Sequence, residues 1–481
     1  MGKSTLPLCN QNTTMRKLIL LEINEIPVRV YDYYVTKYPE SNLARLIASS
    51  SKFETVSTDQ GELHPWSTWP TLHRGVDNTE HHIKDLGEDL AAMDLKFPPV
   101  WQLLTKNGIR SGVFSSLHTY PIPADLTGYD FVVPDPFANG DDVYPEKIRP
   151  FQAFNLAMSR KSGRSVDRGI DKSKAVKLLF ALPGLGLRLQ SVITTLKQLL
   201  AERKEPWKAA RRRTVQSILA FDLYLKLLKK HKPQFTTFFS NHVASSLHRY
   251  WAATFPADYA SNDLPADWID RYKNEIDYCM HQLDGMVGDV LRFVTKNPEY
   301  KLILGSSMGQ AATRAELINQ ELFLSDYSKL NSLLGDVGIE PVSAMHPQYN
   351  FKVDESSAAK TKEVLAQISL NGEPLRFRQK ESTFFSVDLG YPNVESFEVK
   401  KGEQSLAIAD LGFEVKKIDD QSGGTAYHIP EGALYVYDPK NAESSSLTTV
   451  DLREVAPSIL RNYGIELPAY MREGTIKPIF E

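Results

Sequence analysis

Cysteine is nearly absent from this sequence, because its 481 residues include only Cys9 and Cys279. Two cysteines exclude a disulfide framework and a zinc site built from cysteines. Long apolar runs are missing too, since no stretch reaches the roughly 18 residues that predict a membrane-spanning helix. The start, MGKSTLPLCNQNTTM, has no apolar core and no cleavage pattern. We therefore expect no signal peptide, a disordered arm over 1–14 and a cytoplasmic protein.

Charge of one sign is lacking as well: the net charge is −3, which predicts no particular class of partner. What the sequence does contain is a set of segments with an apolar body and a polar end, as in buried parallel strands. They are KLILLEIN (17–24), NGIRSGVFSS (107–116), YDFVVPDPF (129–137), PQFTTFFSNH (233–242) and YKLILGSS (300–307). Helix-like segments at 41–50 and 276–294 lie between them. This alternation predicts an α/β fold with a mostly parallel central sheet covered on both faces.

The carboxyl ends of these strands carry polar side chains, namely Glu22, Asn24, His242 and Ser306. In open α/β sheets, ligands bind beyond the carboxyl ends of the strands. We therefore expect the functional site at this edge of the sheet.

One segment is strongly basic. Residues 160–232 contain 19 Lys and Arg and 5 Asp and Glu, so their net charge is 19 − 5 = +14. The pattern predicts a helical insertion over 151–232 that ends in a basic turn before Pro233. Two interpretations stay open: a solvated helical cover, or a surface attracted to anionic lipid head groups or an anionic substrate. Nucleic acid is not expected, because few aromatic residues are interleaved to stack on bases.

The rest of the chain divides around this insertion. Alternating short strand-like and helix-like pieces predict a small α+β cap subdomain. The predicted parts are a first core segment at 15–150, a second at 233–340, the cap at 341–400 and a last core segment at 401–481.

Four separated motifs resemble the alkaline phosphatase superfamily, in its type I phosphodiesterase/nucleotide pyrophosphatase branch. They are LEINEIP, STWPTLHRGVDNTEHHI, ASSLHRYW and the closing YHIPEGALYVYDP with VDLREVAPSILRNYGIELP, in the family's order. The resemblance spans nearly the whole chain except the basic insertion. It implies a three-layer alkaline-phosphatase-like fold and two close divalent metals that activate a Ser or Thr nucleophile and hold a phosphoryl oxygen.

The resemblance places the nucleophile on Thr68, near the N-terminus of a helix whose first turn contains Pro70. A helix N-terminus favours an anion there, although Thr68 could equally serve as a helix cap. At the nucleophile's metal, the family has an aspartate after the first strand and a Ser-Asp-His-Gly motif. Here these positions are Asn24 and the run from Ser306 through Ser307 and Met308 to Gly309. Hard cations have little reason to bind these neutral side chains.

At the second metal, the family has Asp-x-x-x-His and a late Gly-x-His. Both histidines remain, as His248 and His428, whereas the aspartate has become Ala244. Two imidazoles hold a transition metal only with further ligands, such as His242 or Glu25. The resemblance therefore predicts a lost two-metal centre, with no cofactor or one weakly held divalent ion, Zn or Mn.

Three functional hypotheses follow. The first is a divergent phosphodiesterase- or phosphotransferase-like enzyme with Thr68, His248 and His428 as catalytic residues. Its substrate would be a phosphorylated or glycosylated small molecule or a lipid-linked conjugate, met at a peripheral membrane surface through 160–232. Substrate-binding candidates are Asn24, Glu25, Glu62, His64, Arg74, Ser306 and Ser307. The second is a pseudoenzyme that keeps the cleft for binding or scaffolding. The third keeps one metal on His248 and His428.

Overall fold

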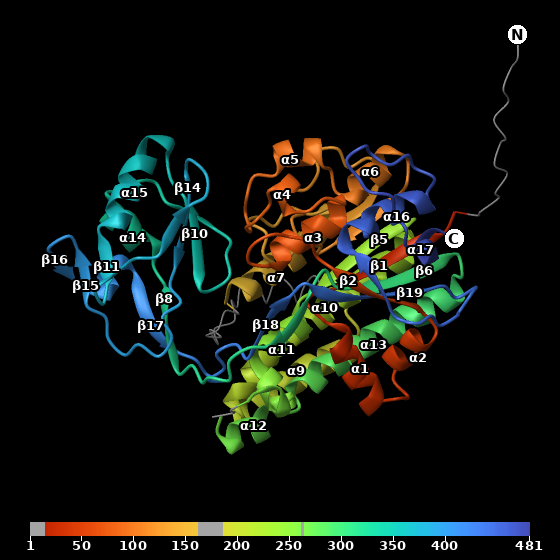
Figure 1. Cartoon of the computed structure of the whole chain (residues 1–481), viewed down its shortest axis with the longest axis horizontal. Coiled ribbons are helices and arrows are strands. Elements are labelled where there is room, and N and C mark those ends of the chain that lie inside the picture. Colours follow the sequence, from red (N-terminus) through yellow and green to blue (C-terminus); the bar gives the residue numbers. More distant parts are fainter. Residues whose placement is uncertain (1–14, 162–185, 261–263) are drawn as a thin grey trace, which may run out of the picture.

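The computed structural model describes residues 15–161, 186–260 and 264–481. Its centre is an eight-stranded sheet with the order β20-β2-β19-β6-β1-β5-β3-β4 (Figure 1). These strands are β1 Lys17–Ile23, β2 Ser51–Val56, β3 Ser111–Phe114, β4 Tyr129–Val133, β5 Phe235–Ser240, β6 Tyr300–Gly305, β19 Glu431–Tyr437 and β20 Thr448–Asp451. All neighbours pair in parallel except β19, which is antiparallel to β2 and β6. The predicted α/β class with a mostly parallel central sheet is confirmed.

The apolar body of β1 explains the layers of the fold. Leu18 and Leu20 pack into the core on one face of the sheet, and Ile19 and Leu21 pack into the core on the other. The first face is covered by α3 Pro65–Arg74, α6 Val100–Lys106, α16 Val455–Asn462 and α17 Lys477–Phe480. The second is covered by α1 Val28–Lys37, α2 Asn42–Ala48, α10 Arg212–His231, α11 His242–Thr254 and α13 Glu275–Lys296. Helix α4 Asn78–His81 packs against α3, and α12 Ala266–Tyr272 packs against α11. Helix α5 Ala91–Lys96 lies between α4 and α6 in the chain.

A separate lobe, here called the cap lobe, stands beside the sheet body (Figure 1). It runs from β8 to β17, contains the predicted cap range 341–400, and has its own hydrophobic core. Its elements are β8 Gln320–Leu324, α14 Tyr327–Leu334, β9 Glu340–Val342, β10 Gln348–Lys352, α15 Ala358–Ala366, β11 Ile368–Leu370, β12 Glu373–Pro374, β13 Phe377–Gln379, β14 Phe384–Asp388, β15 Val399–Lys401, β16 Gln404–Leu406 and β17 Phe413–Lys417. The antiparallel pair β7 Gly309–Ala312 and β18 Ala426–Ile429 joins the lobe to the sheet body.

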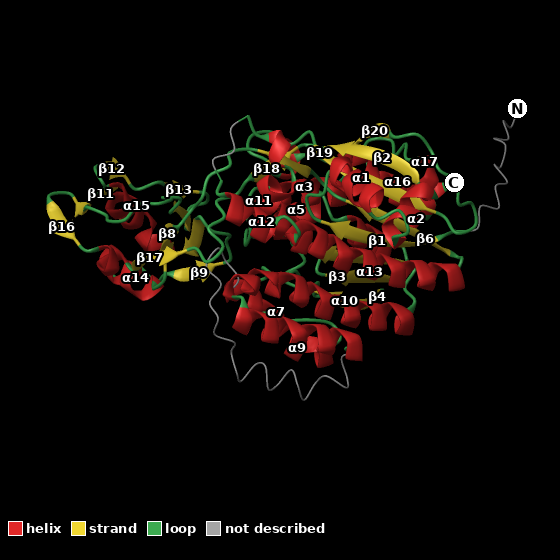
Figure 2. Ribbon diagram, turned by 90° about the horizontal axis from the view of Figure 1, so that it is seen from below, coloured by secondary structure: helices red, strands yellow, loops and turns green. Residues whose placement is uncertain are grey.

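The predicted basic insertion forms helices α7 Arg149–Lys161, α9 Leu189–Lys204 and α10, with the 3-10 helix η2 Pro206–Arg211 between the last two. Residues 162–185 of it, like the predicted arm at 1–14, lie outside the described residues. Helix α10 packs into the core through Leu223, Tyr224 and Leu227. Figure 2 shows α9 outermost, beyond α10 as seen from the sheet. Within the described ranges, no helix is long and apolar enough to cross a bilayer.

Candidate functional site

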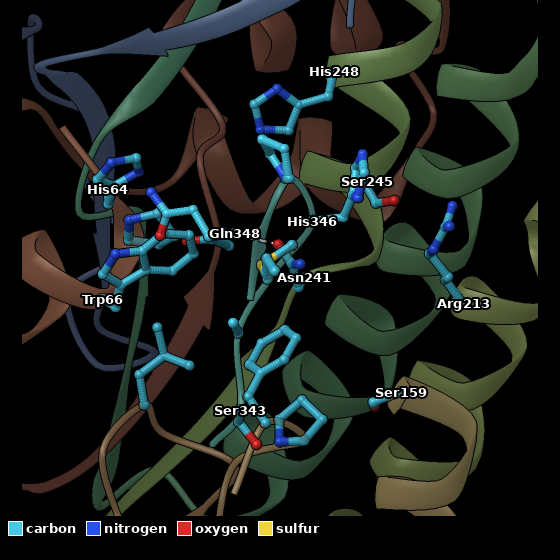
Figure 3. Close-up of a pocket in the computed structure, with 18 of the residues that line it drawn as sticks. His64, Trp66, Ser159, Arg213, Asn241, Ser245, His248, Ser343, His346 and Gln348 are labelled. Carbon is cyan, nitrogen blue, oxygen red and sulfur yellow. Dashed lines mark hydrogen bonds between the residues drawn. The ribbon is translucent and has the colours of Figure 1, made fainter. Parts of the chain in front are cut away.

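A cavity of about 1210 Å³ lies between the sheet body and the cap lobe. Its walls come from the segments that follow β1 and β5, the start of α3, helices α7, α10 and α11, and the cap-lobe residues around β8 to β10. In Figure 3, His64 and Trp66 stand on one side of the view, and Ser245 and Arg213 on the other. The cavity thus opens at the carboxyl ends of parallel strands, where the sequence predicted a site.

Glu25 is the central acidic group of this cavity. It follows β1 and is only 3% exposed. Its Oε1 accepts a hydrogen bond from Nδ2 of Asn24 at 2.6 Å, and its Oε2 accepts one from Nε2 of Gln310 at 2.5 Å. Its backbone φ of 58° is left-handed, which costs a non-glycine residue about 1–2 kcal/mol. A strained, buried carboxylate with both oxygens bonded is typical of a functional site.

Two imidazoles approach the same oxygen of Glu25. Nε2 of His248, on α11, lies 2.8 Å from Oε2, and Nε2 of His428, on β18, lies 3.4 Å from it. The opposite ring nitrogens are bound to backbone carbonyls: Nδ1 of His248 to Ala426 at 2.8 Å and Nδ1 of His428 to Leu63 at 2.6 Å. Since a carbonyl only accepts, each Nδ1 carries a hydrogen.

The Nδ1–H tautomer of His248 and His428 determines whether a proton or a metal ion can lie beside Glu25. With Nδ1 protonated, a neutral ring presents a bare Nε2 lone pair to the Glu25 carboxylate, and these groups repel unless a proton or a metal ion lies between them. Burial alone would raise the pKa of Glu25, but the charges of His428 and His248 outweigh it and hold that pKa well below its usual range. Burial likewise opposes the charge of His428, but the Glu25 carboxylate prevails and raises the pKa of His428. The cluster therefore favours positive charge beside Glu25.

The donor set also fits a zinc-like cation. One ligand atom each from Glu25, His248 and His428 lies within 4.8 Å of the others. Ligand atoms in tetrahedral zinc are about 3.3 Å apart, given bonds of about 2.0 Å, so the 3.4 Å to His428 fits directly. The 2.8 Å to His248 is a hydrogen-bond distance, which must lengthen when a metal replaces the proton. Carbonyls on both Nδ1 atoms and amides on the carboxylate are the outer partners that orient metal ligands.

The neutral polar residues at the other predicted metal position already form hydrogen bonds with their surroundings. The Oδ1 of Asn24 accepts from the indole of Trp69 at 2.7 Å, and its amide also donates to Asn241 at 2.8 Å. The Ser306 hydroxyl donates to the Ile23 carbonyl at 2.6 Å. Met308 is fully buried. Nothing in this arrangement offers a second set of metal ligands among the described residues.

Thr68, the predicted nucleophile, is fully buried in α3. Its Oγ1 shares a hydrogen bond with Oγ of Ser307 at 2.7 Å. Neither residue lines the cavity, and neither does Ser306. Arg74 also lies elsewhere, because its guanidinium is buried against Asp94 at 2.7 Å. The proposed roles of these four residues stay predictions.

The structure does bring the other predicted site residues together. Those that line the cavity are Asn24, Glu25, Glu62, His64, His248 and His428. His64 stacks on Trp66 with ring centroids 4.7 Å apart and lies edge-on to His428 at 5.7 Å. Burial lowers the pKa of His64. Glu62 accepts a hydrogen bond from the Tyr427 hydroxyl at 2.8 Å.

His242, which the sequence offered as an extra metal ligand, lines the cavity but has both nitrogens in use. Its Nδ1 lies 2.7 Å from the Ser240 hydroxyl, and its Nε2 donates to the Cys279 carbonyl at 3.3 Å. Burial lowers the pKa of His242 to about 4. Glu22 does not line the cavity, and its Oε1 lies 2.7 Å from Nε2 of His73 in the core.

Sequence reasoning missed Gln310 and Arg213. Gln310 directly follows the run from Ser306 to Gly309, so its position was visible, but nothing in the pattern showed that its amide reaches Glu25. Arg213 belongs to the basic insertion and lines the cavity from α10. Burial lowers the pKa of Arg213 to about 9.

No protein-family model matches this chain, and no curated protein sequence is similar to it. Among solved structures, it is similar to human ectonucleotide pyrophosphatase/phosphodiesterase 5 at 12% identity, over 95% of this chain and 97% of that one, with a TM-score of 0.42. The murine protein of the same name gives 10% identity over 95% and 98% of the two chains, with a TM-score of 0.41. Its inactive form in complex with AMP gives 11% identity, 95% and 97% coverage and a TM-score of 0.41. This similarity is one of the backbone alone.

Proposed function

We propose that this chain binds a phosphate-containing or glyco-conjugate substrate in the cavity and acts on it with the help of a single divalent cation. Glu25, His248 and His428 would hold that cation, which replaces the two-metal centre that the sequence resemblance implies. A divalent cation at this place would polarise a phosphoryl oxygen. The observation that carries the proposal is that two imidazoles, each with Nδ1 committed to a carbonyl, aim Nε2 at one carboxylate oxygen.

The remaining cavity wall suits such a substrate. The stacked pair His64 and Trp66 offers a flat aromatic surface for a sugar or a base. Nδ1 of His64 and Nε1 of Trp66 are buried without a hydrogen-bond partner among the described residues, so a polar ligand group that reached them would satisfy both. Arg213 and Arg378 add positive charge to the lining, which favours an anionic group.

Elemental analysis of the purified protein, after loading with Zn²⁺ or Mn²⁺ and desalting, tests the cation site. We expect about one equivalent of metal in the wild type, as a site with three protein ligands predicts. The double variant His248→Ala, His428→Ala should retain none. The matched control is His281→Ala, which removes an exposed histidine on α13 and should bind metal like the wild type. A wild type that retains no metal contradicts the proposal.

A second candidate, a binding protein without catalysis, is favoured by the burial of Thr68. For Thr68 to act as a nucleophile, its hydroxyl must leave Ser307 and gain access to the cavity. Hydrolysis of bis(4-nitrophenyl) phosphate by the metal-loaded wild type, absent in Glu25→Gln, supports the enzyme. Saturable binding of a nucleotide-sugar by loaded protein that turns over no phosphodiester supports the binding protein.

A further inference from the structure

Helix α9 carries a stripe of large aliphatic side chains on its solvent side. Leu189 is 76% exposed, Ile193 42%, Leu196 55% and Leu200 59%. Their spacing of three and four residues places them on one face of the helix. These four residues are here called the α9 stripe. Helices on the surface of a globular protein usually turn such a stripe towards the core.

The opposite face of α9 is polar and faces the protein. Ser191 and Gln198 are its buried residues. The Gln198 amide donates to the Lys208 carbonyl at 2.6 Å, and Glu202 pairs with Arg212 at 2.7 Å. These bonds give the polar side chains of the inward face their partners. Rotating the helix about its axis would leave those partners buried and unpaired. The outward orientation of the stripe is therefore built into the packing.

Positive charge borders the α9 stripe on both sides. Lys197, Arg203 and Lys204 are exposed, and none of them forms an ion pair with another described residue. Along the helix, Lys197 and Lys204 project to one side of the stripe and Arg203 to the other. The only carboxylate within α9 is Glu202, which faces inward and is paired. The exposed face thus combines aliphatic side chains with cations and contains no acid.

We propose that the α9 stripe docks on an anionic lipid bilayer, with its aliphatic side chains at the level of the acyl boundary and its cations among the head groups. Helices that lie in a membrane interface have this arrangement of an apolar face bordered by Lys and Arg. Charge complementarity selects lipid phosphates and carboxylates over a neutral apolar partner. The proposal does not depend on the metal site.

The position of α9 gives this docking a consequence for the cavity. Helix α9 packs on α10, and α10 contributes Arg213 and Gln216 to the cavity wall, with Asn155 and Ser159 of α7 beside them. The same helical layer therefore forms a wall of the cavity and the proposed membrane surface. A substrate anchored in the bilayer would be met from this side.

Vesicle sedimentation tests the docking. The full-length protein is mixed with phosphatidylcholine vesicles that contain about 30 mol% phosphatidylserine, and with vesicles of phosphatidylcholine alone. We expect the wild type to sediment with the anionic vesicles at least about tenfold more strongly than with the neutral ones, and to be released by salt. The variant Leu196→Asp, Leu200→Asp should lose at least about tenfold of this binding.

The matched control is Leu95→Asp, which makes the same change at an 85% exposed leucine on α5, away from α9. It should sediment like the wild type. Circular dichroism and thermal unfolding show whether each variant is folded. A second test leaves the stripe intact and uses the triple variant Lys197→Gln, Arg203→Gln, Lys204→Gln. This variant should also bind anionic vesicles more weakly than the wild type. The proposal is overturned if the wild type stays in solution with anionic vesicles. It is also overturned if the stripe variant binds normally, or if light scattering shows a dimer that the stripe variant dissociates.

Discussion

Nε2 of His428 lies 3.4 Å from Oε2 of Glu25, so a strand near the end of the chain meets the loop that follows the first strand. Neither residue reaches the other through local structure. Their meeting depends on β18 pairing with β7 and on β1 lying in the middle of the sheet. Residues this far apart in the sequence are held together only by the complete fold, so the cluster forms only when the whole sheet body is folded.

The amide of Gln310 orients the Glu25 carboxylate, so its removal should weaken metal binding without abolishing it. We expect Gln310→Ala to lower zinc affinity about 10- to 100-fold, the usual effect of losing an outer-shell partner. Glu25→Gln, which removes the carboxylate itself, should have the larger effect. Calorimetric titration with Zn²⁺ measures both, and Gln404→Ala on the exposed strand β16 is the control. Equal affinities for Gln310→Ala and the wild type would contradict the role.

The hydrogen bond between Thr68 and Ser307 should contribute to stability. Thr68→Val keeps the shape of the side chain but leaves the buried Ser307 hydroxyl without its partner, so we expect a loss of about 1–3 kcal/mol in the free energy of unfolding. Thr68→Ser keeps the hydroxyl and should lose less. Urea denaturation measures both values. Unchanged stability in Thr68→Val, together with a loss of phosphodiester hydrolysis, would show instead that Thr68 acts as the nucleophile.

The pair formed by Glu22 and His73 is buried in the core at 2.7 Å. Oε2 of Glu22 already has no hydrogen-bond partner among the described residues. His73→Ala leaves the whole carboxyl group unpaired, and removing one partner of a buried pair costs about 3–5 kcal/mol. Thermal or urea unfolding measures the loss. His82→Ala, at an exposed position, should change stability by less than about 0.5 kcal/mol, and a similar small effect for His73→Ala would refute the assignment.

Glu88 should make the protein less stable as the pH rises. Burial, with the nearby charge of Asp85, raises the pKa of Glu88 from 4.5 to about 7. The folded state then holds a proton that the unfolded state has released, so stability falls between these two pH values and stays low above them. At about 1.4 kcal/mol per pKa unit the effect reaches a few kcal/mol at most.

Glu88→Gln removes this dependence. We expect the variant to unfold at a higher temperature than the wild type at pH 8, with the difference shrinking towards pH 4.5. Differential scanning calorimetry across this pH range measures it. A difference that is the same at all pH values would mean that the charge of Glu88 is not the cause.

The features that could be predicted from the sequence are those that depend on the pattern of residues within short segments. The apolar run of 17–24 with its polar end located β1 and the site that follows it, and the same rule placed β5 and β6. The retained His248 and His428 were recognised from motif order, and both line the cavity. These predictions succeed because strand burial and motif spacing are properties of short segments.

The rest depended on contacts between distant segments. Glu25 and Gln310 became partners only through the fold, and the burial of Thr68 behind Ser307 has no sequence signal. For α9, the spacing of the aliphatic residues shows an amphipathic helix but not which face packs on the protein. The inward polar contacts that decide this come from η2 and α10.

The strand pair that connects the cap lobe to the sheet body contacts Glu25, the carboxylate at the centre of the candidate site. Gln310 on β7 and His428 on β18 sit opposite each other in the strand pair that carries the lobe, and both side chains contact Oε2 of Glu25. A proton or cation between Glu25 and His428 would therefore also tie β1 to the strand pair that carries the lobe.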